Sequence, residues 1–204
     1  MNKKIILFDW DDTLFSKTEY KKRLSAALAN VTKIPEDEVW KFEEEYFESL
    51  DRSGDFRVDN FLKFISQRSE IKIDLTNFVN DNLNIYSGSV FSEVINVLNQ
   101  LRNTFVLGVY SQGFNDLQRM KIKNSGLENY FDEKLIYINS NKLDPKFIAT
   151  LPTESIIIDD KKEVIETLKQ LRPDLELIWI NRINDEKMEG VKTITSLREL
   201  EDFI

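Results

Sequence analysis

The stretch IILFDWDDTLF, residues 5–15, sets four apolar residues directly before three aspartates and a threonine. A short, continuous apolar run is typical of a strand that is covered on both faces of a sheet. Carboxylates at the end of such a strand repel one another, and burying one of them is unfavourable unless it is paired or binds a metal. The stretch is therefore either a solvated loop or part of a charged functional site.

Four later apolar runs resemble residues 5–8, and helical patterns lie between them. The runs are FVLGVY at 105–110, LIYI at 135–138, SIII at 155–158 and LIWI at 177–180. Residues 90–102 and 162–172 each place apolar residues on one helical stripe: Phe91, Val94, Ile95, Leu98 and Leu101 in the first, and Val164, Ile165, Leu168 and Leu171 in the second. This alternation predicts an α/β fold, with a Rossmann-like parallel sheet core and helices on both of its faces.

Residues 16–87 interrupt the alternation. They contain the amphipathic stretches YKKRLSAALANV, PEDEVWKFEEEYFESL and VDNFLKFISQ but no buried strand. We therefore expect an α-helical unit over 16–87, inserted into a core formed by residues 1–15 and 88–204. The aromatic residues at helical spacing in this unit are predicted to form its own core: Trp40, Phe42, Tyr46 and Phe47. Arg52 and Arg57 flank a glycine-containing loop, where solvated charge is a simpler interpretation than contact with a substrate anion.

The sequence has no histidine and no cysteine. Their absence excludes disulfides, thiolate nucleophiles, Ser-His-Asp triads and metal sites built on imidazole or thiolate. Acid-base chemistry must then use Asp, Glu, Lys, Tyr, Ser or Thr. A metal must be a hard cation bound by oxygen.

The charge balance and the apolar runs limit the partners. The chain carries 28 Lys and Arg against 36 Asp and Glu, a net charge of -8, which weighs against a nucleic-acid partner. No apolar run approaches the roughly 20 residues that span a bilayer. Asp9 also ends the first apolar run too early for a signal peptide. We therefore expect a cytoplasmic protein with no membrane partner.

Polar residues follow the predicted strands at one edge of the sheet, where parallel α/β proteins bind their ligands. They are Asp9, Asp11, Asp12 and Thr13 after the first strand, Ser111, Gln112 and Gly113 after the second, and Asp159 and Asp160 after the run at 155–158. Lys142 and Lys146 in NKLDPKF precede that run. This set of groups suits phosphoryl transfer. It offers carboxylates that hold Mg²⁺, a free carboxylate as nucleophile, a hydroxyl and an ammonium.

These residues resemble the motifs of the haloacid dehalogenase (HAD) superfamily. FDWDDTLF is similar to its hhhDxDxT signature, VYSQG to its strand-ending Ser/Thr, KLDPKF to its lysine element and IIIDDKKEVIETLK to its acidic fourth motif. IYSGSVFSEVINVLNQLR and NSGLENYFDEKLI also resemble connecting segments of the family. The resemblance covers about 5–15 and 86–180 with the elements in the family's order. The inserted helical unit matches the family's C1-type cap only in position and character.

The resemblance implies a role for each matching residue. Asp9 would be the nucleophile and Asp11 the general acid/base. Ser111 and Lys142 would hold the phosphoryl group of a small phosphomonoester, with Thr13 and Gln112 also near the substrate. Asp9, Asp159, the main-chain carbonyl of Asp11 and, through water, Asp160 would bind Mg²⁺. Lys134 and Lys146 are competing candidates for the lysine element.

Three positions depart from the family's pattern. Ile158 stands where the fourth motif has glycine, Leu143 where the lysine element has proline, and Asp12 where the first motif often has glycine. None of these departures removes a reacting group.

Other functions compete with a phosphatase. A phosphomutase of the same family differs mainly in the acceptor of the phosphoryl group, and a haloacid dehalogenase has no use for Asp11 or magnesium. A phosphorylated receiver module places its lysine last, whereas Lys142 precedes the second acidic element. A catalytically idle binding protein is suggested by Ile158 but opposed by the joint presence of Asp9, Asp11, Ser111, Lys142 and Asp159.

Overall fold

One parallel sheet organises the core of the chain. The computed structural model describes residues 3–50, 56–69 and 71–202. Within them, six parallel strands lie in the order β3-β2-β1-β4-β5-β6. The strands are β1 (Ile5–Phe8), β2 (Val106–Gln112), β3 (Ile136–Asn139), β4 (Ile156–Asp159), β5 (Glu176–Ile180) and β6 (Lys192–Ile194). The predicted α/β fold is confirmed.

The five apolar runs of the sequence all form strands, but one is less buried than predicted. Every residue of β1 after the first and every residue of β4 is buried, whereas all four residues of β3 are half-buried. The reason is that β3 is an edge strand, with a neighbour on one side only. The other edge, β6, was not predicted, because KTI is too short and polar to stand out as an apolar run.

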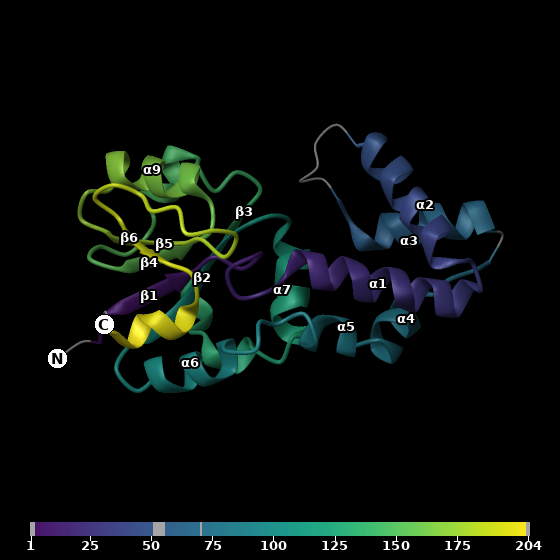
Figure 1. Cartoon of the computed structure of the whole chain (residues 1–204), viewed down its shortest axis with the longest axis horizontal. Coiled ribbons are helices and arrows are strands. Elements are labelled where there is room, and N and C mark those ends of the chain that lie inside the picture. Colours follow the sequence, from purple (N-terminus) through teal and green to yellow (C-terminus); the bar gives the residue numbers. More distant parts are fainter. Residues whose placement is uncertain (1–2, 51–55, 70, 203–204) are drawn as a thin grey trace. The chain divides into compact units, whose positions relative to one another are not determined.

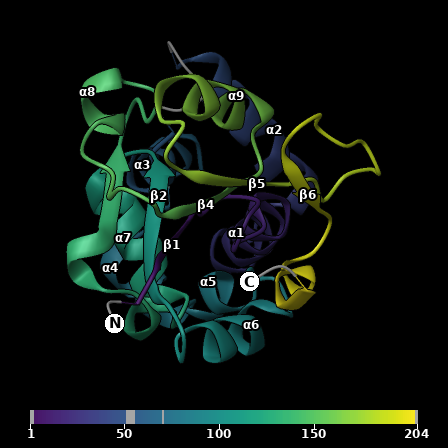
Figure 2. The same ribbon diagram turned by 90° about the vertical axis from the view of Figure 1, so that its left-hand side faces the viewer.

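Helices cover both faces of the sheet, with α8 and α9 on one face and α6 on the other (Figures 1 and 2). The core helices are α6 (Val94–Leu101), α7 (Asn115–Asn124), α8 (Pro145–Ile148) and α9 (Lys162–Leu171), with short 3-10 helices η2 (Glu128–Tyr130), η3 (Glu133–Leu135) and η4 (Leu197–Asp202). Residues of β1, β2 and β4 pack with α8 and α9 in one apolar cluster that includes Leu7, Tyr110, Ile157 and Leu168. The core thus supports the strands whose ends carry the predicted site.

Two residues of the predicted helical stripes are exposed instead of buried. In α6 the buried residues are Val94, Val97, Leu98 and Leu101. Val97 takes the place that Ile95 was predicted to have on the buried face of the helix, and Ile95 is 49% exposed. Leu171, in the last turn of α9, is 47% exposed, while Val164, Ile165 and Leu168 are buried as predicted.

In a second compact unit, the elements formed by the described residues are all helices. The chain divides into one unit of Met1–Ser16 with Val90–Ile204 and another of Lys17–Ser89. The second unit contains α1 (Lys17–Thr32), α2 (Glu36–Glu48), α3 (Val58–Ser69), α4 (Leu75–Asp81) and α5 (Asn84–Ser87). The described residues of this segment form helices, and α4 and α5 are two that the amphipathic stretches of the sequence did not indicate.

The helical unit has an aromatic centre around Tyr46. The Tyr46 ring lies 5.4 Å from that of Phe61 and 5.6 Å from that of Phe56, and Tyr46 is buried as predicted. Trp40, predicted to join this core, is 36% exposed. Arg57 pairs with Asp59 at 3.2 Å, and Arg52 lies outside the described residues.

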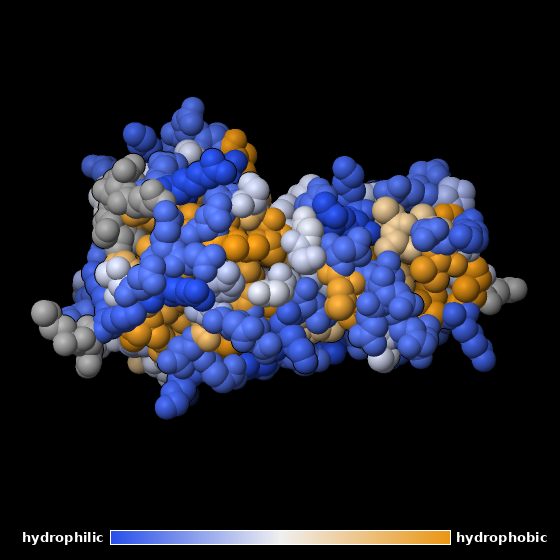
Figure 3. Space-filling view, turned by 90° about the horizontal axis from the view of Figure 1, so that it is seen from below, coloured by the Kyte–Doolittle hydropathy of each residue, from blue (hydrophilic) through white to orange (hydrophobic). Residues whose placement is uncertain are grey.

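The described helices include none that is long and apolar enough to cross a membrane. The face drawn in Figure 3 is mainly hydrophilic, with apolar residues in separate patches. This distribution agrees with a composition that is 31% charged.

Candidate active site

Strand register brings the predicted catalytic residues of three strands to one edge of the sheet. Phe8 at the end of β1 is level with Val109 of β2 and Ile158 of β4. Asp9 and Asp159 each follow by one residue, and side chains at the same level of neighbouring parallel strands point to the same face. The Asp9 amide donates to the Ile158 carbonyl at 2.8 Å. Ile158, which replaces the family's glycine, is fully buried in the sheet and leaves this contact intact.

Lys142 joins the two carboxylates. Its Nζ lies 2.5 Å from Asp9 Oδ1 and 2.6 Å from Asp159 Oδ2, and the lysine is fully buried. The competing candidates Lys134 and Lys146 are both exposed. Lys142 is therefore the lysine that the fold delivers to the strand ends.

The loop that carries Lys142 is held at several points. The Tyr110 hydroxyl donates to the Lys142 carbonyl, and burial raises the pKa of Tyr110, which keeps that hydroxyl protonated. The Leu143 amide donates to Asn141 Oδ1 at 3.2 Å. A proline at position 143 could not make this bond, so Asn141 restrains the loop in place of the family's proline. Asp144 caps α8 by accepting from the Lys146 amide at 2.9 Å.

The electrostatics favour a charged lysine between two acids. Burial by itself lowers the pKa of Lys142, but the carboxylates of Asp159 and Asp9 raise it above its ordinary value. Burial raises the pKa of the Asp9 carboxyl, against the lowering effect of the Lys142 ammonium, and Asp159 and Asp160 raise that pKa further. Three carboxyl groups and one ammonium share this edge, and a bound cation would relieve the repulsion among the acids.

Three carboxylates could share a metal ion. One oxygen each from Asp9, Asp159 and Asp160 lies within 4.8 Å of the others. Hard carboxylate oxygens are the ligands that Mg²⁺ prefers, so this donor set fits magnesium. The Asp11 side chain is not part of the group, and its main-chain carbonyl stays a predicted ligand.

A tight turn after β1 contains Asp11. The amides of Leu14 and Phe15 both donate to the Trp10 carbonyl at 3.0 Å. Asp12 has φ of 64°, in the left-handed region, where Asp is tolerated better than most residues. This conformation explains why glycine is common at the matching position of the family's motif.

Thr13 and Gln112 each accept a side-chain hydrogen bond through the backbone carbonyl, Thr13 from Arg182 and Gln112 from Gln118. The Thr13 carbonyl accepts from Arg182 at 2.8 Å, and Arg182 also pairs with Glu93 at 2.7 Å. The Thr13 side chain is fully buried, and the Gln112 side chain is exposed. Contact between either residue and a substrate stays a prediction.

The chain was compared with known protein families, curated proteins and solved structures. No family model matches the chain. It is 27% identical over 122 residues to the pyrimidine 5'-nucleotidase YjjG of Escherichia coli K12, and the match covers 54% of each protein. The chain thus spans about half the length of this curated relative.

Solved structures match over nearly the whole chain. A HAD phosphatase from Thermococcus onnurineus has a TM-score of 0.62 and 22% identity, covering 98% of this chain and 96% of that one. A putative haloacid dehalogenase-like hydrolase from Burkholderia xenovorans has a TM-score of 0.68 and 17% identity, covering 100% and 97%. The putative HAD-hydrolase YfnB from Bacillus subtilis, solved with magnesium, has a TM-score of 0.60 and 16% identity, covering 99% and 98%.

This chain has the HAD fold. The resemblance stated from its motifs is confirmed at the level of the fold, and the motif residues Asp9, Lys142 and Asp159 are in mutual contact through the lysine.

The sequence motifs of the HAD fold did not point to two further residues of the site. Gln118 Nε2 lies 2.9 Å from Ser111 Oγ and 3.1 Å from Asp11 Oδ2. Lys121 Nζ lies 2.9 Å and 3.0 Å from the two carboxylate oxygens of Asp11. Both residues are on α7, the helix that follows the Ser111 strand, three residues apart on one face. Their spacing was visible in the sequence, but their contact with Asp11 depends on the fold.

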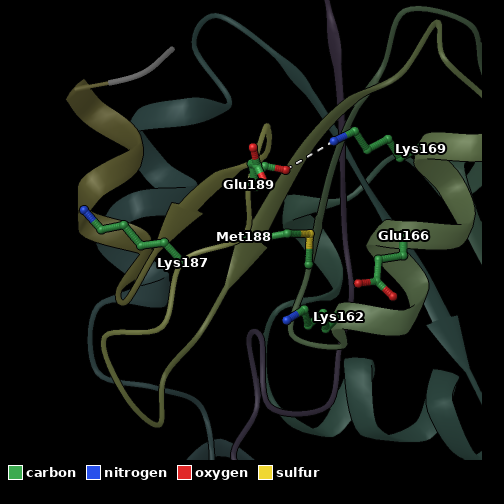
Figure 4. A pocket seen from close by; sticks show the side chains of 6 residues that line it. All are labelled: Lys162, Glu166, Lys169, Lys187, Met188 and Glu189. Carbon is green, nitrogen blue, oxygen red and sulfur yellow. Dashed lines mark hydrogen bonds between the residues drawn. The ribbon is translucent and has the colours of Figure 1, made fainter.

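A cavity of about 400 Å³ in the HAD core is lined by none of the predicted site residues (Figure 4). Its walls come from α9 and the loop after β5, through Lys162, Glu166, Lys169, Lys187, Met188 and Glu189. Lys162 pairs with Glu186 at 2.8 Å, and Lys169 donates to the Glu189 carbonyl at 3.2 Å. These two lysines are occupied by protein acceptors, and the cavity has no part in the proposed chemistry.

Proposed function

We propose that the chain is a magnesium-dependent phosphatase that hydrolyses a small phosphomonoester through an aspartyl phosphate on Asp9. The observation that carries the proposal is Lys142, whose ammonium contacts Asp9 and Asp159 together at the sheet edge. Ser111 and Asp11 lie on the same edge, linked by Gln118. Phosphoryl transfer requires a nucleophile, a cation, a hydroxyl and a second carboxyl, and this edge of the sheet offers all four.

In the first step, a carboxylate oxygen of Asp9 attacks phosphorus and the bond from phosphorus to the leaving oxygen breaks. The Asp11 carboxyl gives its proton to that oxygen, so the product leaves as a neutral alcohol. In the second step, the Asp11 carboxylate takes a proton from water as the water oxygen attacks phosphorus. Inorganic phosphate departs and the Asp9 carboxylate is restored.

Lys142 and Ser111 support both steps by hydrogen bonding to phosphoryl oxygens, where the negative charge of the transition state gathers. Asp9, Asp159 and Asp160 would hold Mg²⁺, with the main-chain carbonyl of Asp11. The bound ion would neutralise charge on the phosphoryl group.

The class of substrate is proposed from two observations. The curated relative is named as a pyrimidine 5'-nucleotidase, so nucleoside monophosphates belong among the first candidates. The helical unit of Lys17–Ser89, inserted between β1 and β2, is proposed to act as a cap that closes over the substrate and excludes water. We propose a cytoplasmic enzyme, in keeping with the sequence analysis.

Haloacid dehalogenases share this fold, and one from Pseudomonas syringae matches with a TM-score of 0.57 and 19% identity. Their reaction needs neither a proton donor two residues after the nucleophile nor a metal. The Asp11 contacts and the group of three carboxylates therefore favour the phosphatase.

The test is release of inorganic phosphate from para-nitrophenyl phosphate, nucleoside 5'-monophosphates and sugar phosphates, with magnesium and with EDTA. Asp9→Asn protein, prepared identically, is the blank. We expect magnesium-dependent release above the blank, and the best substrate of the panel identifies the class. No release from any member would contradict the phosphatase, and transfer to a second sugar hydroxyl would support a phosphomutase.

A further inference from the structure

Gln118 occupies a buried position between two predicted catalytic residues. The residue is 3% exposed although its side chain is polar. Its Nε2 atom lies 2.9 Å from Ser111 Oγ, 3.1 Å from Asp11 Oδ2 and 3.0 Å from the Gln112 carbonyl. A buried amide is normally retained where it has specific partners. Here the partners include the predicted acid/base and the predicted phosphate-binding hydroxyl.

The chemistry of the neighbours fixes how this amide is turned. The Oδ2 oxygen of Asp11 and the Gln112 carbonyl accept hydrogen bonds, so the NH₂ group faces them. The NH₂ group has two hydrogens for three acceptors, so the Ser111 oxygen shares one of them. Because the Ser111 oxygen accepts here, the hydroxyl hydrogen of Ser111 is left for another acceptor. The Gln118 contact therefore favours a Ser111 hydroxyl that donates, as a group that binds a phosphoryl oxygen must.

Lys121 holds the same carboxylate one helical turn further along α7. Its Nζ contacts Oδ1 of Asp11 at 2.9 Å and Oδ2 at 3.0 Å. Both side chains of this ion pair are largely shielded, with exposures of 19% for Lys121 and 21% for Asp11. Residues three apart on a helix share a face, so α7 presents the amide and the ammonium to Asp11 together.

We propose that Gln118 and Lys121 are positioning residues for phosphoryl transfer. They fix the carboxyl of Asp11, and Gln118 also fixes the hydroxyl of Ser111, so that the proton donor and the phosphate-binding group keep a constant separation. The inference rests on the proposed function, because it assigns these residues to the reaction proposed there. Neither residue transfers a proton or contacts the phosphoryl group in this role.

The test compares Gln118→Met and Lys121→Met with controls of the same chemical change. Lys123→Met alters an exposed lysine of the same helix, and Gln170→Met alters an exposed glutamine on α9. Steady-state kinetics are measured for a poor alkyl leaving group and for para-nitrophenyl phosphate. Misplacement of a catalytic group by about 1 Å can lower the rate roughly 100-fold. We expect at least a tenfold lower kcat for the alkyl substrate in each test variant, a smaller loss for para-nitrophenyl phosphate and no loss in the controls.

A double-mutant cycle separates positioning from general damage to the fold. In the Asp11→Asn background, adding Lys121→Met should have little further effect on the alkyl substrate, because the group that it positions has lost its function. A full, additive loss in that background would overturn the inference. Lys121 is half-buried, so its variant serves as the test even where the Gln118 variant does not fold.

The outcomes for the inference and for the proposed function differ. If the wild-type protein is active and kcat is unchanged in both test variants, the inference alone is overturned. No turnover by wild-type protein on the whole panel would overturn the proposed function and the inference with it.

Discussion

Lys142 Nζ lies 2.5 Å from Oδ1 of Asp9, although the two residues are 133 positions apart in the chain. Both are buried, so the predicted nucleophile already has a counter-charge in place. Breaking a buried pair by removing one partner leaves an uncompensated charge, which is strongly unfavourable. The pair therefore has consequences for both stability and activity.

Asp9→Asn should abolish turnover and preserve the fold. The amide oxygen can still accept from Lys142, and Asp159 still pairs with the ammonium. We expect phosphate release to fall by about a thousandfold or more, as with other variants that remove a nucleophile. Phosphate release and a circular dichroism melt check this prediction, and substantial turnover by the variant would exclude covalent catalysis by Asp9.

Asp11→Asn should lower kcat most for poor leaving groups. Protonation by a general acid contributes roughly 100- to 10,000-fold when the leaving group needs it, and little when the leaving group is already stable as an anion. A series of phosphate esters with leaving groups of different pKa measures the effect. Equal losses along the series would contradict the role of Asp11 as an acid.

Lys142→Met should destabilise the protein in EDTA by about 3 to 5 kcal/mol, because Asp9 and Asp159 would face each other without a cation. Lys146→Met is the matched control, since Lys146 is exposed and we expect a change within about 0.5 kcal/mol. Urea unfolding curves give both values. Equal stability of the two variants would show that the buried pair is not a stabilising element of the apo protein.

Magnesium should stabilise the wild-type protein by binding only to the folded state. At an ion concentration of about 100 times the Kd, the expected gain is about 2.7 kcal/mol. Asp159→Asn should lose most of the resulting rise in Tm, and Asp185→Asn, a change at an exposed acid outside the acidic cluster, should keep it. A thermal melt with and without the ion reports this without any substrate. An equal rise in Tm for both variants would argue against a site at Asp159.

The ion pair of Arg172 and Asp174 should stabilise the fold only above mildly acidic pH. The hydrogen bond from Arg172 lowers the pKa of Asp174 to about 2, against about 3.9 in an unfolded chain. Because the folded-state pKa is the lower one, the contribution is present above pH 4 or so and is lost as the pH falls toward about 2. The stability difference between wild type and Asp174→Asn should therefore shrink over that interval, measured by urea unfolding at each pH. A constant difference would contradict the assignment.

The sheet and the acidic residues at its edge could be predicted because each follows from a local pattern. Asp9 and Asp159 directly end apolar runs, and parallel strands place such ends together. The resemblance favours Lys142 over Lys146, and Lys142 is the lysine that lies buried against both acids.

The rest depended on contacts that no local pattern encodes. Gln118 lies 107 positions from Asp11, on a helix whose sequence is mostly polar. The exposure of Ile95 and the half-burial of β3 follow from the orientation of a helix and from strand order, which hydrophobic periodicity does not specify.

The covalent intermediate is the most direct test of the account. Wild-type protein is mixed with its best substrate and magnesium, quenched in acid within the first turnovers, and analysed by intact mass and peptide mapping. The account predicts a protein fraction heavier by one phosphoryl group, with the group on Asp9 and absent from Asp9→Asn. Rapid phosphate release with no phosphorylated protein at any quench time, or a phosphoryl group on another residue, would contradict it.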